Sequence, residues 1–94
     1  MEHYTLKLYI VGHTPVAQRA IVNLKRLCEE DDLGNHYTTE VINLLEQPQL
    51  AEDEKILATP MLIRHLPLPM QRIIGDLSDR EAVLVGLNLY GGDG

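Results

Sequence analysis

The first half of this chain is constrained most strongly by one segment. In it apolar and other residues alternate, and residues typical of the start of a helix follow directly. In the segment 4–11, Leu6, Leu8 and Ile10 recur at every second position, which is the period of a strand with one buried face. The segment ends at Gly12-His13-Thr14-Pro15, where threonine suits a helix N-cap and proline the first helical position. The sequence therefore predicts a strand followed at once by a helix.

The residues after Pro15 complete a βαβ unit. Apolar side chains recur at helical spacing over residues 15–30; they are Ala17, Ala20, Ile21, Leu24, Leu27 and Cys28. Residues 36–45 then favour a second strand, with Val41 and Leu45 among its apolar positions. Two strands joined by one amphipathic helix are parallel by the right-handed crossover rule.

The second half carries weaker signals. Pro48 can open a short helix that reaches about Leu57, and the segments 61–66 and 71–75 are short strand candidates. Pro67 and Pro69 interrupt the first of these strands, so we expect any pairing there to lie at a sheet edge or a turn. Thr59-Pro60 stands before the same strand, where thioredoxin-like folds place a cis-proline, and we expect a structural turn.

The last segment is ambiguous between helix and strand. Ser78 and Glu81 form an S-x-x-E capping box that predicts a final helix. The apolar residues of the segment 83–90 nevertheless fit the two-residue period of a strand as well as the period of a helix. Gly86 weakens a helix by roughly 0.5–1 kcal/mol relative to alanine. The summed pattern predicts an α/β, thioredoxin-like single domain over residues 1–94.

Charge and composition exclude several kinds of partner. The formal net charge is −6, with eight Lys and Arg scattered along the chain, so no basic face for nucleic acid or an anionic membrane is expected. No apolar run approaches the roughly 18 residues that span a bilayer, and the first residues lack the pattern of a signal peptide. A single cysteine fits a reducing compartment, and we expect a cytoplasmic protein.

The residues that would support catalysis are missing from the expected places. A thioredoxin-type enzyme needs a cysteine in the loop between the first strand and the first helix, and residues 12–15 contain no sulfur. Cys28 lies on the apolar stripe, where we expect a buried inert thiol. The four histidines show no metal-ligand spacing, and no glycine-rich phosphate loop is present. We therefore predict no catalytic, cofactor or metal site.

Several blocks of the sequence resemble one known family. They are Leu6-Lys7-Leu8-Tyr9 with Gly12-x-Thr14-Pro15, the block 48–52, the block Lys55-Ile56-Leu57-Ala58-Thr59-Pro60, and the block 72–78. Together they resemble the circadian clock protein KaiB family over residues 4–90. The resemblance implies a non-enzymatic protein that binds a hexameric KaiC-type ATPase and modulates its phosphorylation state and the access of partners. KaiA or a sensor histidine kinase are the further partners it implies.

The resemblance also implies site residues and a second fold. It places partner contacts at Gln49, Glu52, Asp53 and Lys55. It implies a metamorphic family, whose tetrameric ground state rebuilds the C-terminal half, and the protein is expected to associate with itself as a dimer or tetramer. The switch-sensitive stretch corresponds to Gly86-Leu87-Asn88, where family members commonly carry Asp in place of Asn88.

Two other functions remain open from the sequence. One is a stress-response adaptor of the same family that has left the clock but still binds signalling ATPases or kinases. The other is a redox enzyme of the thioredoxin superfamily, which the missing sulfur in the loop 12–15 argues against.

Overall fold

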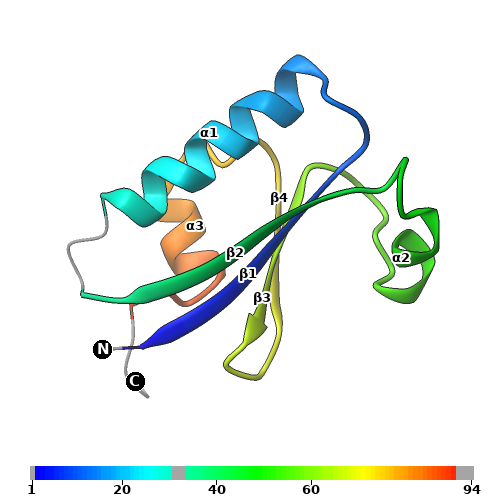
Figure 1. Cartoon of the computed structure of the whole chain (residues 1–94). Coiled ribbons are helices and arrows are strands. Elements are labelled where there is room, and N and C mark those ends of the chain that lie inside the picture. The colour runs from blue at the N-terminus through cyan, green and yellow to red at the C-terminus, as the bar shows by residue number, and fades with distance from the viewer. Residues whose placement is uncertain (1, 31–33, 91–94) are drawn as a thin grey trace.

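The computed structural model describes residues 2–30 and 34–90 of the chain and arranges them around one four-stranded sheet (Figure 1). The elements in chain order are β1 (His3–Ile10), α1 (Pro15–Glu29), β2 (His36–Asn43), α2 (Pro48–Asp53), β3 (Met61–Leu66), β4 (Gln71–Ile74) and α3 (Arg80–Gly86). The strand order is β2-β1-β3-β4, and β1 pairs with β2 in parallel and with β3 antiparallel. This mixed α/β sheet is the thioredoxin-like arrangement that the sequence predicts.

The first half confirms the βαβ prediction closely. The predicted core residues of β1, Leu6, Leu8 and Ile10, are fully buried. The Thr14 hydroxyl caps α1 by accepting a hydrogen bond from the Ala17 amide at 3.2 Å. One boundary is wrong: β2 ends at Asn43, and Leu45, expected on this strand, lies beyond it with 67% of its surface exposed.

The second half corrects two sequence expectations about α2 and β3. The helix expected to reach Leu57 ends at Asp53. The strand β3, for which the sequence predicts pairing at a sheet edge or a turn, lies inside the sheet between β1 and β4 and is buried over Met61–Arg64. Pro67 and Pro69 lie in the β3–β4 turn, outside the paired residues. Every paired residue of β3 therefore keeps its backbone amide donor.

The start of α3 also differs from the prediction. Its N-cap is Asp79, whose carboxylate accepts from the Ala82 amide at 3.1 Å. The expected cap, Ser78, instead donates its backbone amide to the Asp76 carboxylate. An aspartate caps a helix as well as a serine does, so the two adjacent candidates competed and the helix begins one residue later.

The ambiguous segment 83–90 resolves into the end of a helix and an anchored tail. Asn88 adopts φ 52°, and the Leu89 amide reaches back to the Leu84 carbonyl at 2.8 Å, which is the bonding of a Schellman C-cap. Leu87 and Leu89 are both fully buried. The stretch 86–88, which the resemblance predicts to be sensitive to a fold switch, therefore forms the helix terminus in this fold.

Polar side chains hold this terminus against the sheet. Arg64 on β3 is only 4% exposed, and its guanidinium donates to the carbonyl oxygens of Asn88 at 3.1 Å and Pro69 at 2.7 Å. The same guanidinium lies 6.0 Å from the centre of the Tyr4 ring. Asn35 donates to the Leu89 carbonyl at 2.9 Å. These contacts join the C-terminal segment to both halves of the chain.

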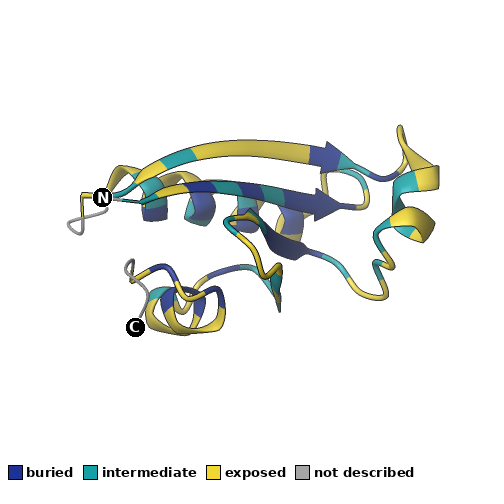
Figure 2. Ribbon diagram, turned by 90° about the horizontal axis from the view of Figure 1, so that it is seen from below, coloured by how far each residue is buried: buried dark blue, intermediate teal, exposed yellow. Residues whose placement is uncertain are grey.

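The two faces of the sheet are covered unequally. Residues of α1 and α3 pack on the face that carries Leu6, Leu8 and Ile10. The dark blue stretches of ribbon in Figure 2 mark the buried residues. A smaller cluster around Tyr9, with Ile42, Leu44, Met61 and Ile63, lies against residues 50–56. The second face is therefore covered chiefly at the end where α2 sits.

Candidate protein-interaction surface

The short helix α2 ends in a strained turn at a residue predicted to contact a partner. Lys55 adopts φ 54°, its amide bonds to the Glu52 carbonyl at 3.1 Å, and the Ile56 amide bonds to the Ala51 carbonyl at 2.8 Å. This is again the Schellman pattern, whose left-handed position is usually glycine. A lysine held there costs of order 1 kcal/mol or more, and such outliers are common at functional sites.

An apolar hollow of about 240 Å³ opens beside this turn. It is lined by Val11, Leu44, Leu45, Ala51, Ile56, Leu57, Ala58 and Thr59. Leu57 is 93% exposed and Leu45 67% exposed, so the hollow has apolar walls that solvent covers. Grouped exposed apolar residues of this kind mark interaction sites.

The local fold holds the rim of the hollow in place. The Asn43 side-chain oxygen accepts from the amides of Gly12 and Leu45, both at 3.0 Å. One side chain thus ties the β1–α1 loop to the turn after β2. The peptide bond Thr59–Pro60 is cis, at the structural turn that the sequence predicts.

The four predicted partner-contact residues gather on this surface. Gln49, Glu52, Asp53 and Lys55 are all exposed. Gln49 donates to the Asp53 carboxylate at 3.0 Å across one turn of α2. The sequence missed the apolar hollow beside them, because Leu45 and Leu57 were assigned to a strand and a helix that both end earlier.

A tyrosine–histidine pair links β1 to β3, with Tyr9 buried and His65 half-buried. The Tyr9 hydroxyl is 3.1 Å from His65 Nε2, and Tyr9 is 1% exposed. Burial, followed by the charges of Glu54 and Glu40, raises the pKa of Tyr9 to about 12. The hydroxyl therefore stays protonated at neutral pH and lies within hydrogen-bonding distance of the imidazole.

Burial lowers the pKa of His65, and the Lys7 and Arg72 charges act in the same direction, against Glu54 and Glu40. Because the folded state holds this proton less tightly than the unfolded chain, His65 destabilises the fold when it is protonated. We expect the free energy of unfolding to fall as pH drops below about 6.5. Urea unfolding across this range should show a shallower dependence for His65→Gln than for His13→Gln; equal slopes would contradict the assignment.

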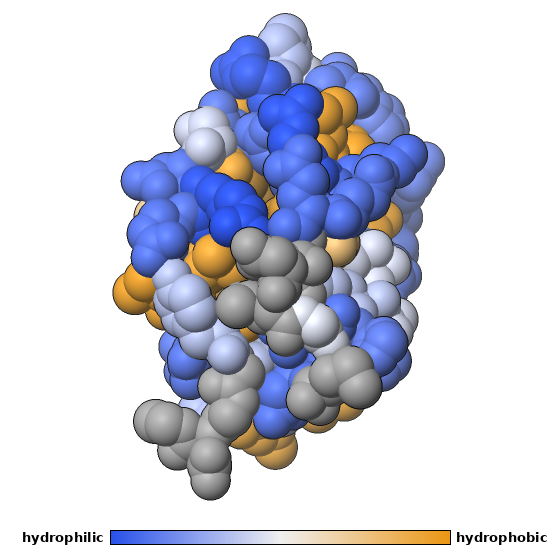
Figure 3. All heavy atoms as spheres, turned by 90° about the vertical axis from the view of Figure 1, so that its left-hand side faces the viewer, coloured by the Kyte–Doolittle hydropathy of each residue, from blue (hydrophilic) through white to orange (hydrophobic). Residues whose placement is uncertain are grey.

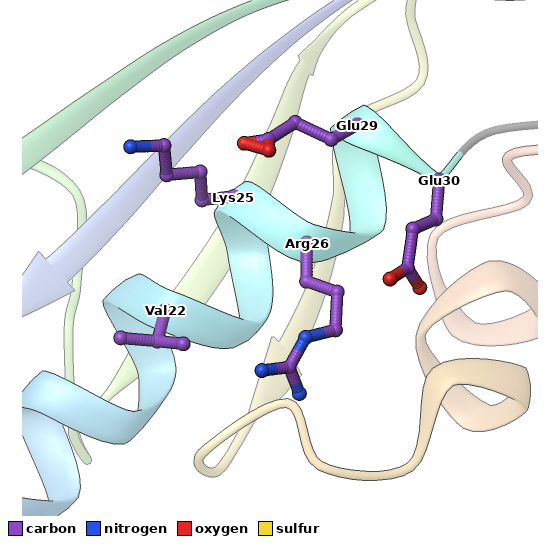
Figure 4. A pocket seen from close by; sticks show the side chains of 5 residues that line it. All are labelled: Val22, Lys25, Arg26, Glu29 and Glu30. Atoms are coloured by element: carbon purple, nitrogen blue, oxygen red, sulfur yellow. The ribbon is translucent and has the colours of Figure 1, made fainter.

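Two other hollows lie along α1. Cys28, expected to be buried, is half-buried in an apolar groove of about 360 Å³ between α1 and β2. A second hollow on α1 is lined by Val22, Lys25, Arg26, Glu29 and Glu30. Figure 4 shows Lys25 and Glu29 extending over one side of the helix and Arg26 and Glu30 over the other. The charged groups do not converge, as expected of a solvated helix surface.

A metal-binding cluster and a membrane-spanning helix are both absent from the described part of the chain. Over residues 2–30 and 34–90, no three His, Cys, Asp or Glu side chains gather into a group that could hold a metal ion. In the same residues, every helix is too short or too polar to cross a membrane.

Comparison with known proteins decides the family. The model of the KaiB domain matches residues 7–89. The chain belongs to the KaiB family. The "Circadian clock protein KaiB3" of Synechocystis sp. is 54% identical over 89 residues, which cover 95% of this chain and 86% of that protein. The "Circadian clock oscillator protein KaiB" of Synechococcus elongatus is 56% identical over 90 residues, covering 96% and 87%.

Solved structures agree with the thioredoxin-like fold of this KaiB-family chain. The N-terminal domain of Synechococcus elongatus SasA matches with a TM-score of 0.77 and 27% identity, covering 100% of this chain and 90% of that one. Mitochondrial thioredoxin 3 of Saccharomyces cerevisiae matches with a TM-score of 0.66 and 14% identity, covering 90% and 76%. The second likeness concerns the fold alone.

Proposed function

We propose that this KaiB-family chain is a non-enzymatic, cytoplasmic clock or signalling protein that binds a KaiC-type hexameric ATPase. The observation that carries the proposal is the apolar hollow at the α2 end. The exposed residues Gln49, Glu52, Asp53 and Lys55 lie next in sequence to Ala51 and Ile56, which line it. A solvated apolar centre with a polar rim is the usual anatomy of a protein interface. By binding there, the protein modulates the phosphorylation state of the ATPase and the access of other partners.

Further partners follow from the same reasoning. We propose a sensor histidine kinase as a further partner, which competes for the ATPase. The backbone of this chain is similar to that of the SasA N-terminal domain. KaiA is a second proposed partner. The remaining parts of the proposal are self-association as a dimer or tetramer and a second fold of the C-terminal half.

Size-exclusion chromatography with light scattering tests the central claim. The chain is run alone and after long incubation with its cognate KaiC-type ATPase and nucleotide. We expect a shift into a ring-sized complex, and a slow shift would indicate that the binding-competent fold is scarce. Absence of a complex under every nucleotide condition would overturn the proposal and favour the clock-independent adaptor.

Lys55→Glu is expected to weaken this complex without lowering the melting temperature. The substitution reverses the only positive charge among the four predicted contact residues, while the exposed position contributes little to stability. Binding measured by biolayer interferometry should fall, and differential scanning calorimetry should show an unchanged transition. Lys25→Glu, an exposed lysine on α1, is the control; unchanged binding of Lys55→Glu would reject the predicted contact.

Gly86→Ala is expected to favour the thioredoxin-like state. Gly86 is the last residue of α3, where alanine is the better helix former by roughly 1 kcal/mol. The added methyl group would contact the Ile73 side chain, whose Cδ1 atom is nearest at 3.2 Å, and we expect this flexible end to shift by a few tenths of an ångström to make room. In NMR spectra of the concentrated protein, the population of the state described here should rise. A fall or no change would refute the role of residue 86 in the balance between folds.

A further inference from the structure

Two histidines far apart in the sequence become neighbours at one end of the sheet. His3 opens β1 and His36 opens β2, and the parallel register pairs them directly. Laterally paired residues of parallel strands point to the same face, about 4.8 Å apart along the sheet. Both residues are exposed. Because 32 residues separate them in the chain, no argument from sequence spacing predicts this pair.

The His3 ring is held over the strand that carries His36. Its Nε2 atom lies 2.6 Å from the Thr38 hydroxyl oxygen. Thr38 follows His36 by two positions on β2 and therefore lies on the same face. With the ring proton on Nε2, this bond leaves the Nδ1 lone pair available. Metal-binding histidines commonly fix their second ring nitrogen by such a hydrogen bond.

We propose that His3 and His36 form a chelating pair for a late divalent transition-metal ion such as Zn²⁺. Zinc binds imidazole nitrogen at about 2.0–2.1 Å, and two imidazoles on adjacent strands can approach one ion at this distance. Imidazole ligands favour Zn²⁺ over Mg²⁺ and Ca²⁺, which prefer oxygen. Water fills the remaining positions of this two-residue site.

The position of the pair separates it from the proposed partner surface. α2 follows the opposite ends of the strands (Figure 1). Figure 3 looks at the molecule from the end away from α2 and shows mostly hydrophilic side chains, with apolar ones between them. A bound ion would clamp β1 to β2 at this end and leave the hollow beside α2 untouched. Binding of Zn²⁺ and binding of the ATPase can therefore be tested independently.

Titration of the full chain with Zn²⁺ tests the proposal. Isothermal titration calorimetry should show one ion per chain, and the melting temperature should rise with Zn²⁺ concentration because the ion binds the folded state. His3→Gln and His36→Gln should each weaken the affinity by at least about tenfold, and Thr38→Val by about tenfold. His13→Gln, an exposed histidine before α1, is the matched control and should bind as the parent does.

The His36→Gln variant is the most decisive test of the paired site. Cu²⁺ and Ni²⁺ are avoided because they favour square-planar sites and can bind the first residues of a chain through backbone nitrogens. An unchanged Zn²⁺ affinity in His36→Gln would overturn the paired site. So would an equal loss in His13→Gln, or the absence of any heat or thermal shift in the parent. Nitrogen NMR of the imidazoles should show both rings shifting together.

Discussion

Leu57→Asp is expected to weaken binding of the KaiC-type ATPase by about 30-fold or more. Leu57 is the most exposed apolar residue at the hollow, with 93% of its surface in solvent. Loss of an apolar anchor at the centre of an interface commonly costs about 2 kcal/mol or more, and a carboxylate buried there adds a desolvation penalty. The stability of the free chain should change by no more than about 0.5 kcal/mol, because the position is a surface one.

Leu68→Asp provides the matched control for this prediction. Leu68 is also apolar and 71% exposed, but it lies in the β3–β4 turn at the other end of the sheet. Surface plasmon resonance on the immobilised ATPase should detect a loss of affinity for Leu57→Asp alone. Equal losses in the two variants would mean that general surface hydrophobicity, and not the hollow, drives association.

Arg64→Ala is expected to reduce the free energy of unfolding by about 2–4 kcal/mol. The side chain is almost fully buried and donates to two carbonyl oxygens. A hydrogen bond from a charged group has a net contribution of about 1.5–3 kcal/mol, and burial of the cation offsets part of the sum. Truncation also leaves a cavity between β3 and the C-terminal segment. The loss should appear as a lower midpoint in urea unfolding.

Arg26→Ala is the control for the arginine itself. Arg26 is exposed on α1, and its removal should change stability by no more than about 0.5 kcal/mol. Arg64→Lys separates charge from geometry, because one ammonium group replaces a planar fork that spans two acceptors. If Arg64→Ala is as stable as the parent, the desolvation cost of the buried cation cancels its bonds, as occurs for some buried charges.

The first half of this fold was predictable because its signals agree with one another. The alternation of β1, the Thr14 cap and the apolar stripe of α1 all specify the same short-range structure. The second half was harder, because its pairing depends on distant partners. β3 became an interior strand only because β1 and β4 flank it, and no local feature of Met61–Leu66 reports that.

The functional surface was predictable in part for a similar reason. The exposed polar residues of α2 follow from the resemblance and from helical spacing. The hollow beside them depends on where β2 and α2 end, and boundaries are the least certain part of any sequence-based assignment. Register across strands, which pairs His3 with His36, is invisible to spacing along the chain.

Lys55, which adopts a left-handed backbone conformation just after α2, is expected to affect stability and partner binding in opposite directions. A glycine at position 55 would relieve a backbone strain of order 1 kcal/mol, yet it would remove the ammonium group from the proposed interface. Selection for heat resistance alone would therefore drive this position toward glycine, and selection for partner choice would retain lysine. In a library of variants at residue 55, selection for heat resistance should enrich glycine and selection for partner binding should enrich lysine.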